Sequence, residues 1–315
     1  MLPPSRRVHV LFSLRRLHRP HLHQPLPRLR GGGADHVPSR NADTLARQFP
    51  LPGDKHLTFD EASHTYTAWK VCVPRSVTAI VGSLFERFDP AGCAGEYYER
   101  WARDSRSPYH AVIRHVRAHG GTDADAAAAI CQGWERLGGE ASRLGTALHL
   151  HAELNANGVP ANAPAELSKE VEQFDAFMRS DFVRAPDLRP FRTELAVAWC
   201  ADERAVTAGQ IDALFRSRDG LVTMIDFKRV ASKHSLQPWA SAFRHAYGRP
   251  PVALLPDTPF WRYSLQQSLY NVMLKQVRRP SCSHRYAPNA MPVHRHAPSA
   301  CAHRARVHAD PRRRL

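Results

Sequence analysis

The sequence has no hydrophobic run long enough to cross a membrane and no cysteine pair spaced as C-x-x-C. The first absence argues against a transmembrane helix, which needs about 20 consecutive apolar residues. The second argues against a zinc site, because such sites are usually built from closely spaced pairs. The six cysteines are scattered along the chain. We therefore expect reduced thiols in an intracellular protein that has no membrane partner.

Acidic residues are almost missing from both ends of the chain. Residues 1–34 hold seven arginines and no acid, and residues 277–315 hold nine arginines and one aspartate. Between them, residues 35–276 balance 28 basic against 28 acidic side chains, so the net charge of +15 lies in the two ends. A basic chain invites a nucleic-acid partner, but this charge says little about the central segment.

The two ends show little of the pattern that builds a core. Residues 1–50 are expected to be a disordered basic leader. A basic amphipathic helix over 6–18 would instead fit a mitochondrial transit peptide, and a wrongly chosen start codon is the third alternative. The mitochondrion is thus one expected location and the nucleus the other. Over 277–315 the sequence predicts a disordered tail, which is either a frameshifted terminus or a DNA-binding extension.

In the central segment, two hydrophobic runs with strand-like composition each contain an acid. Asp212 lies in the run 208–215, and Asp226 lies in the run 221–230. Burying a carboxylate in such a run without a partner costs several kcal/mol in the free energy of folding. Residues two apart in a strand share a face, so Asp226 and Lys228 should point the same way. Two acids and a lysine indicate a divalent metal site, and the alternative is a surface hairpin with a salt bridge.

Turn residues at 218–220 separate the two runs and predict an antiparallel hairpin. The upstream run 194–200 is a candidate third strand. The region 84–143 has a helical pattern rich in aromatic residues, with a break expected at Gly138-Gly139. Its aromatic side chains would either stack on single-stranded bases or form a core.

Two further segments place polar side chains on one helix face. Thr146, His149 and Glu153 are spaced i, i+3 and i+7, and Gln266 and Tyr270 are spaced i and i+4. A single helical histidine is more often structural than a ligand, and such a Gln–Tyr pair is usually surface decoration. The histidine could also bind a metal ion, and the Gln–Tyr pair could hold a phosphate backbone.

Taken in order, four short motifs resemble the RecB-like branch of the PD-(D/E)XK nuclease superfamily, including the mitochondrial genome maintenance exonuclease type. The motifs are Gly145-Thr146-Ala-Leu-His149, Gly209-Gln-Ile-Asp212, Asp226-Phe-Lys228 and Gln266-Gln-Ser-Leu-Tyr270. The resemblance implies a nuclease-like domain over 51–276. It also implies an α/β restriction-endonuclease-like core, in which helices flank a mixed central sheet, with a helical N-terminal region.

The resemblance also implies roles for the matched residues. Asp212 and Asp226 would bind Mg²⁺ or Mn²⁺, with His149 and the Phe227 carbonyl as further ligands. Lys228 would orient or deprotonate the attacking water and offset charge on the phosphoryl oxygens.

The substrate strand would be positioned by three other matched residues, namely Thr146, Gln266 and Tyr270. Glu153 and Glu194 are site candidates of second rank. For each, an ordinary acid on the surface is an equally good interpretation. Some relatives carry a four-cysteine iron–sulfur cluster. We do not expect one here, because the clustered C-terminal cysteines that it requires are absent.

The expected function is metal-dependent cleavage of DNA, as an exonuclease acting on ends or single strands in DNA repair. Two alternatives stay open. One is an RNA-directed nuclease. The other is an inactive nuclease-fold protein that binds nucleic acid, which is favoured by the lack of an apolar strand after residue 276, where the family continues into another core strand.

Overall fold

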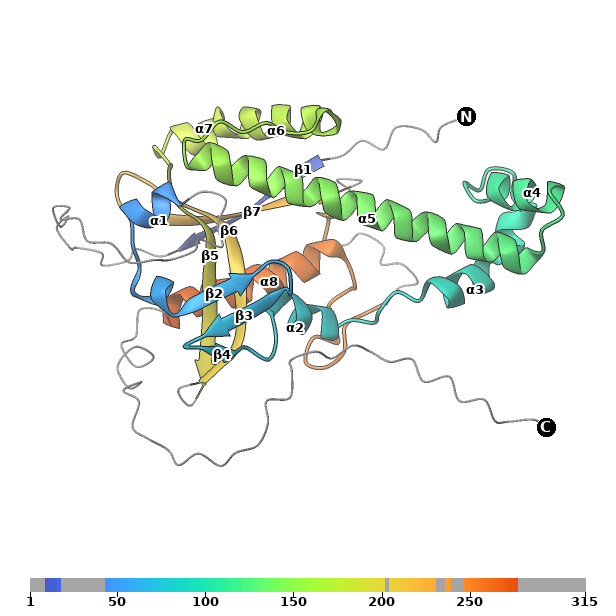
Figure 1. Cartoon of the computed structure of the whole chain (residues 1–315), viewed down its shortest axis with the longest axis horizontal. Coiled ribbons are helices and arrows are strands. Elements are labelled where there is room, and N and C mark those ends of the chain that lie inside the picture. Colours follow the sequence, from blue (N-terminus) through green and yellow to red (C-terminus); the bar gives the residue numbers. More distant parts are fainter. Residues whose placement is uncertain (1–8, 18–42, 202–203, 231–235, 239–245, 277–315) are drawn as a thin grey trace. The chain divides into compact units, whose positions relative to one another are not determined.

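The computed structural model describes residues 9–17, 43–201, 204–230, 236–238 and 246–276, all within one compact unit of the chain. The expected tail over 277–315 lies outside the described residues. The described part is a mixed α/β structure with eight α-helices and two antiparallel sheets (Figure 1). None of its helices is long and apolar enough to cross a membrane.

The larger sheet contains the residues of the predicted hairpin. Its four strands follow the order β1, β7, β6, β5 and span His9–Leu17, Val222–Val230, Arg204–Arg216 and Arg189–Ala201. Strands β6 and β7 pair antiparallel, and β5 pairs with the other edge of β6. The predicted hairpin and its third strand are therefore confirmed. The apolar runs of β6 and β7 are nearly continuous, which matches their burial on both faces of the sheet.

Strand β1 lies inside the segment for which a leader was expected. It pairs with β7 along its whole length, from His9 opposite Val230 to Leu17 opposite Val222. Over the described residues 9–17 the chain is therefore a strand and not part of the helix considered over 6–18. The pairing satisfies N–H and C=O groups that the edge of β7 would otherwise leave open. Near the end of the expected 1–50 leader, helix α1 spans Thr44–Gln48.

The named strands of the described part pair only in the antiparallel sense, so the expected mixed sheet is not found there. Among the described residues, the one parallel contact is an isolated bridge between Ser76 and Ala208. Two parallel strands that are neighbours in a sheet need a long crossover connection between them. The stretch after α8, where the resemblance places a further core strand, lies outside the described residues.

The smaller sheet joins β2, β3 and β4, which span Leu57–Asp60, Thr65–Ala68 and Val71–Cys72. The short helix η1 (Pro52–Lys55) precedes it. The buried Arg192 guanidinium of β5 donates to both Asp54 carboxylate oxygens, at 2.8 and 3.0 Å, and so ties this N-terminal layer to the larger sheet.

The remaining helices span Val77–Ser83 (α2), Pro90–Arg103 (α3), His110–Ala118 (α4), Asp123–Ala156 (α5), Ala165–Leu167 (η2), Ser168–Met178 (α6), Asp181–Arg184 (α7) and Pro259–Gln276 (α8). Helix α5 is continuous through Gly138-Gly139, so the expected break there is wrong. Each glycine costs about 1 kcal/mol in a helix interior, which strong helix formers on both sides outweigh. The helix starts with a capping box between Thr122 and Asp125.

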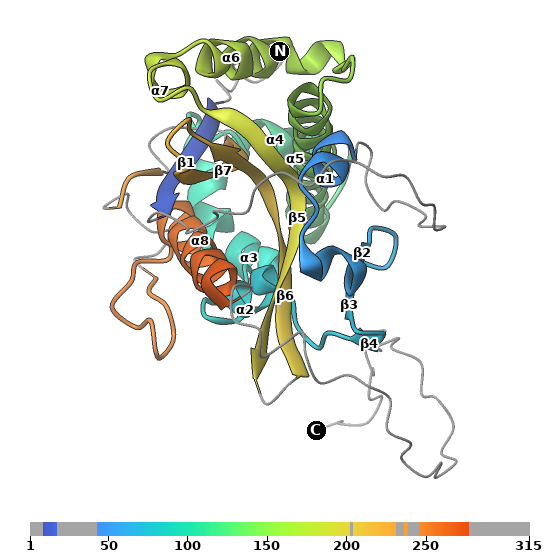
Figure 2. The same ribbon diagram turned by 90° about the vertical axis from the view of Figure 1, so that its left-hand side faces the viewer.

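Helices pack on both faces of the larger sheet, with α8 and α5 on opposite sides of β5 and β6 (Figure 2). Leu214 and Met224 belong to a buried cluster with residues of α2 and α8. Their chain neighbours Ala213 and Ile225 belong to another buried cluster, with residues of α5 and α6. The two-residue period of the strands thus divides the core into two layers. Helix α5 contacts β6 and β7, the strands that carry Asp212 and Asp226.

Candidate metal centre

Strands β6 and β7 stop pairing with each other where their acids begin. Ala213 and Ile225 form the last paired positions on this side, and the next residues are Asp212 and Asp226. The Phe227 backbone N–H donates to Asp212 Oδ2 at 2.7 Å. The Asp212 carboxylate therefore accepts the hydrogen bond that a backbone carbonyl would accept in a regular strand pair. This bond holds Asp212 at the fork where the two strands separate.

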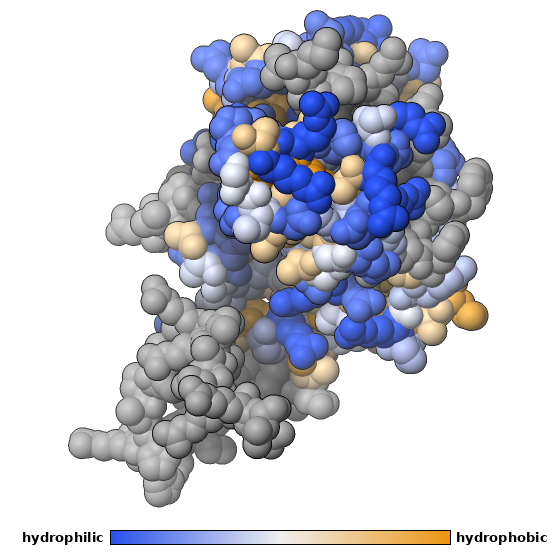
Figure 3. All heavy atoms as spheres, turned by 90° about the vertical axis from the view of Figure 1, so that its right-hand side faces the viewer, coloured by the Kyte–Doolittle hydropathy of each residue, from blue (hydrophilic) through white to orange (hydrophobic). Residues whose placement is uncertain are grey.

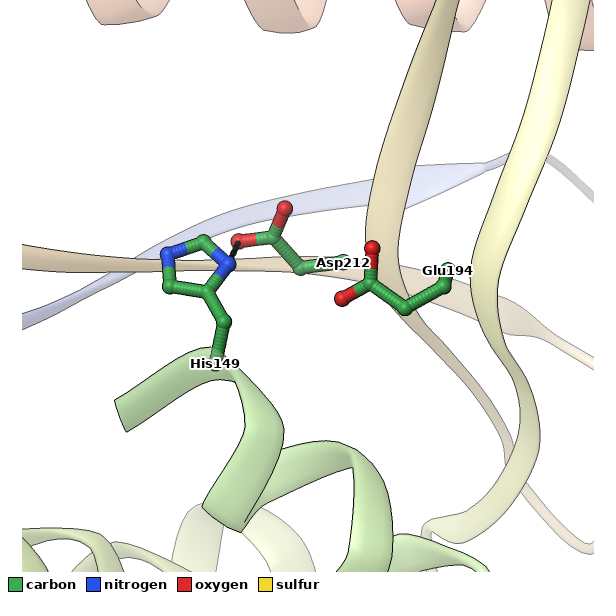
Figure 4. A group of neighbouring side chains, drawn as sticks. All are labelled: His149, Glu194 and Asp212. Carbon is green, nitrogen blue, oxygen red and sulfur yellow. Dashed lines mark ion pairs between the residues drawn. The ribbon is translucent and has the colours of Figure 1, made fainter. Parts of the chain in front are cut away.

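Three elements bring potential ligands together at this fork (Figure 4). Ligand atoms of His149 from α5, Glu194 from β5 and Asp212 from β6 all lie within 4.8 Å of one another. The His149 Nδ1 atom is 3.5 Å from Asp212 Oδ2. Carboxylate oxygens with an imidazole nitrogen suit a divalent cation, and the nitrogen favours Mn²⁺ over Mg²⁺. The donor set therefore fits the expected metal.

Glu194 reaches this cluster through an unusual backbone conformation. In the β5–β6 register it falls opposite Asp212, between the pairs formed by Thr193 and Leu195, and its φ is 45°. Residues other than glycine rarely adopt this region, at a cost of about 1–3 kcal/mol, and those that do gather at functional sites. The Gln210 side-chain amide donates to the Glu194 carbonyl oxygen at 3.2 Å and supports this conformation.

Lys228 lies beside both strand acids. Its Nζ atom is 2.7 Å from Asp226 Oδ2 and 3.8 Å from Asp212 Oδ2, and it lies 5.6 Å from the centre of the Tyr263 ring. Burial lowers the pKa of Lys228, but Asp212 and Asp226 outweigh burial and hold that pKa above its usual value. The lysine is therefore a fixed positive charge. The prediction that Asp226 and Lys228 share a face is confirmed.

The site carries more negative charge than Lys228 can balance. Burial, reinforced by the Asp212 charge, raises the pKa of Asp226 to about 6. Burial also raises the pKa of Glu194, with further contributions from Asp212 and Glu153. A divalent cation would relieve this repulsion, since a nearby positive charge favours the ionised form of each acid.

The metal set expected from the sequence is only partly the set that the structure brings together. His149 and Asp212 are in the cluster, whereas Asp226 lies outside it and is paired with Lys228. Glu194, ranked second, takes the third place. The feature of the sequence that could have identified Glu194 is its place as an acid at the start of the apolar run 194–200 within β5. Phe227 was expected to bind the metal through its carbonyl oxygen. It lies at the site, where its backbone N–H donates a hydrogen bond to Asp212.

The residues expected to position a substrate occupy two different environments. Tyr270 is buried, and its hydroxyl accepts a hydrogen bond from the Gln266 amide at 3.1 Å. Burial raises the pKa of Tyr270 to about 12, so the hydroxyl stays protonated. Thr146 is exposed, one helical turn before His149. Glu153, the other acid of second rank, is buried on the same helix.

Two supporting residues at the site carried no signal in the sequence. Gln210 holds the Glu194 backbone, and Tyr263 lies against the Lys228 ammonium. Both contacts join residues far apart in the chain. No family model, no curated protein and no solved structure matches this chain. The interpretation of the site therefore depends on its own geometry.

Proposed function

We propose that this protein is a metal-dependent nuclease that hydrolyses phosphodiester bonds in DNA, acting as an exonuclease on ends or single strands. The observation that carries the proposal is the convergence of His149, Glu194 and Asp212 within 4.8 Å, beside the charged Lys228. The helices on both faces of the β5–β7 sheet support the proposal of a restriction-endonuclease-like core.

The residues present suit this chemistry. When bound, Mg²⁺ or Mn²⁺ would polarise a phosphoryl oxygen and lower the pKa of a bound water. His149, Glu194 and Asp212 would hold the ion. The Lys228 ammonium is a preorganised donor next to them, and it would stabilise the negative charge that develops on the phosphoryl oxygens. Asp226 holds that ammonium in place at 2.7 Å.

Metal titration and cleavage test this function together. Calorimetry should show that Mn²⁺ binds the wild type, and that Asp212→Asn and Glu194→Gln weaken binding by about 10-fold or more. The same variants should lose cleavage of end-labelled single-stranded DNA. Glu140→Gln, at an exposed position of α5, is the matched control and should behave as the wild type. Equal Mn²⁺ affinity in all four proteins would overturn the proposal.

A second candidate is an inactive nuclease-fold protein that binds nucleic acid. The observation that favours it is the engagement of Asp226 by Lys228, which leaves this acid outside the ligand cluster. Binding of Mn²⁺ and DNA without cleavage would identify this candidate. Cleavage of an RNA strand in preference to the DNA strand of the same sequence would instead identify an RNA-directed nuclease.

A further inference from the structure

A cavity of about 640 Å³ lies in the helical region formed by α3, α4 and the first half of α5. Five aromatic side chains line it: Phe88, Tyr97, Trp101, Tyr109 and Trp134. The Tyr97 and Trp101 rings are stacked, with centroids 5.8 Å apart, and Trp134 meets Phe88 edge-on at 5.4 Å. The cavity is thus walled by the faces and edges of rings.

The interior of the helical region is a buried cluster of Tyr98, Ile113, Ala126 and Ile130, and the partly buried rings of Trp101, Tyr109 and Trp134 pack against it. Phe88 and Tyr97 are the two cavity rings outside this core. None of the five cavity residues is fully buried, and Phe88 is 58% exposed. Aromatic surface left open to water at a concave site marks a binding surface more often than a packing role.

The charges around the cavity suit a phosphate-bearing ligand. Arg100 and Arg106 line it, together with one acid, Asp104, which pairs with Arg106 at 3.2 Å. The neighbouring helix α4 contains two arginines and two histidines and no acid. Figure 3 shows the side of the molecule on which α3 and α4 lie, where hydrophilic side chains dominate the surface. Aromatic rings beside arginines are how proteins bind unpaired bases without reading their sequence.

The cavity and the candidate metal centre are joined by a single rigid element. Trp134 and His149 both belong to α5. At 1.5 Å per residue, the distance along the helix between them is about 22 Å. A strand whose end lies at the metal centre would therefore have to extend over several nucleotides to reach the rings.

We propose that the aromatic cavity is a subsite that stacks unpaired bases of single-stranded DNA at a distance from the bond that is cut. The subsite rests on the proposed function for its substrate class, but its binding does not require cleavage. Phe88 provides the test, because its exposure lets the ring be changed without disturbing the core.

The experiment measures affinity for a long fluorescent oligo(dT) in EDTA, by anisotropy, with the full chain. Phe88→Leu keeps an apolar side chain but removes the ring, and Phe88→Trp keeps a ring. We expect Phe88→Leu to weaken binding by about 5-fold or more, the loss of one stacked base, and Phe88→Trp to bind as the wild type. Val71→Ala, at an exposed apolar position of β4, is the control and should change nothing.

An oligonucleotide of the same length with abasic sites separates bases from phosphates. The wild type should bind it more weakly than oligo(dT), and the difference between wild type and Phe88→Leu should disappear. Equal affinity of wild type and Phe88→Leu for oligo(dT), or equal affinity of the wild type for both strands, would overturn the subsite. Ring-dependent binding without metal-dependent cleavage would keep the subsite and remove the proposed function. Metal-dependent cleavage with ring-independent binding would remove the subsite and keep the proposed function.

Discussion

The Tyr270 ring occupies the space that a side chain at Gly209 would need. A β-carbon at Gly209 would lie 2.6 Å from Tyr270 Cε1 and 2.9 Å from its hydroxyl oxygen. Gly209 is three residues before Asp212 on β6, and Tyr270 belongs to α8. The close approach of this strand and this helix therefore depends on the missing side chain, and two of the sequence motifs meet at one contact.

Gly209→Ala should consequently loosen the site from a distance. The methyl group would push apart β6 and α8, at a cost of about 1–3 kcal/mol in the free energy of unfolding. Mn²⁺ affinity should fall as well, because β6 carries Asp212. Urea unfolding and calorimetry measure the two effects. Gly95→Ala is the matched control, since no heavy atom lies within 4 Å of a β-carbon there. Equal stability of the two variants would contradict the contact.

Lys228→Met should abolish cleavage and also destabilise the metal-free protein. The methionine keeps the apolar stem but leaves Asp226 and Asp212 without their cation, and removing one partner of a buried pair is costly. The side chain of Lys228 is partly exposed, so we expect a loss of about 1–3 kcal/mol in EDTA. Added Mn²⁺ should restore part of this stability. Lys275→Met, at an exposed position of α8, should keep both stability and activity. A stable variant with undiminished cleavage would remove Lys228 from the mechanism.

Asp226→Asn should make the metal-free protein more stable at pH 7. The pKa of Asp226 is about 6 in the fold, above the ordinary 3.8, because of burial and the Asp212 charge. The fold therefore binds this proton more tightly than the unfolded chain does. The stability contributed by this group is full below pH 3.8 and is lost as the pH rises towards 6.

Urea unfolding in EDTA at pH 4 and pH 7 measures this effect. The asparagine variant should gain on the order of 1–3 kcal/mol over the wild type at pH 7, and this gain should shrink at pH 4. The same variant should lose cleavage, because Lys228 then lacks its closest partner. Parallel pH profiles for the two proteins would show that Asp226 carries no such electrostatic cost.

Gln210→Ala should weaken metal binding although Gln210 is not in the ligand cluster. Its amide holds the carbonyl of Glu194, whose backbone has a φ of 45°. Without this hydrogen bond Glu194 should relax towards an ordinary strand conformation and leave the cluster. Mn²⁺ affinity should fall by about 10-fold or more, whereas stability should change by only about 1 kcal/mol. Gln132→Ala, at an exposed position of α5, is the control. An unchanged Mn²⁺ affinity would mean that Glu194 is held by other contacts.

Periodicity alone was enough to predict the local parts of the site. The alternation around Asp226 and Lys228 places both on one face, and their 2.7 Å ion pair agrees with that prediction. The hairpin that carries Asp212 and the helix that carries His149 were likewise readable from short segments. Each of these features depends on residues within a few positions of one another, which is the range over which strand and helix geometry acts.

The third ligand and the edge of the sheet were decided only by tertiary structure. Glu194 has an ordinary strand sequence around it, and it joins His149 and Asp212 because β5 lies opposite β6 and is held there by Gln210. Strand β1 pairs with the edge of β7, a segment far away in the chain. The sequence by itself determined which side chains share a face. The pairing of distant segments determined which faces meet, because those contacts join residues that local sequence cannot relate.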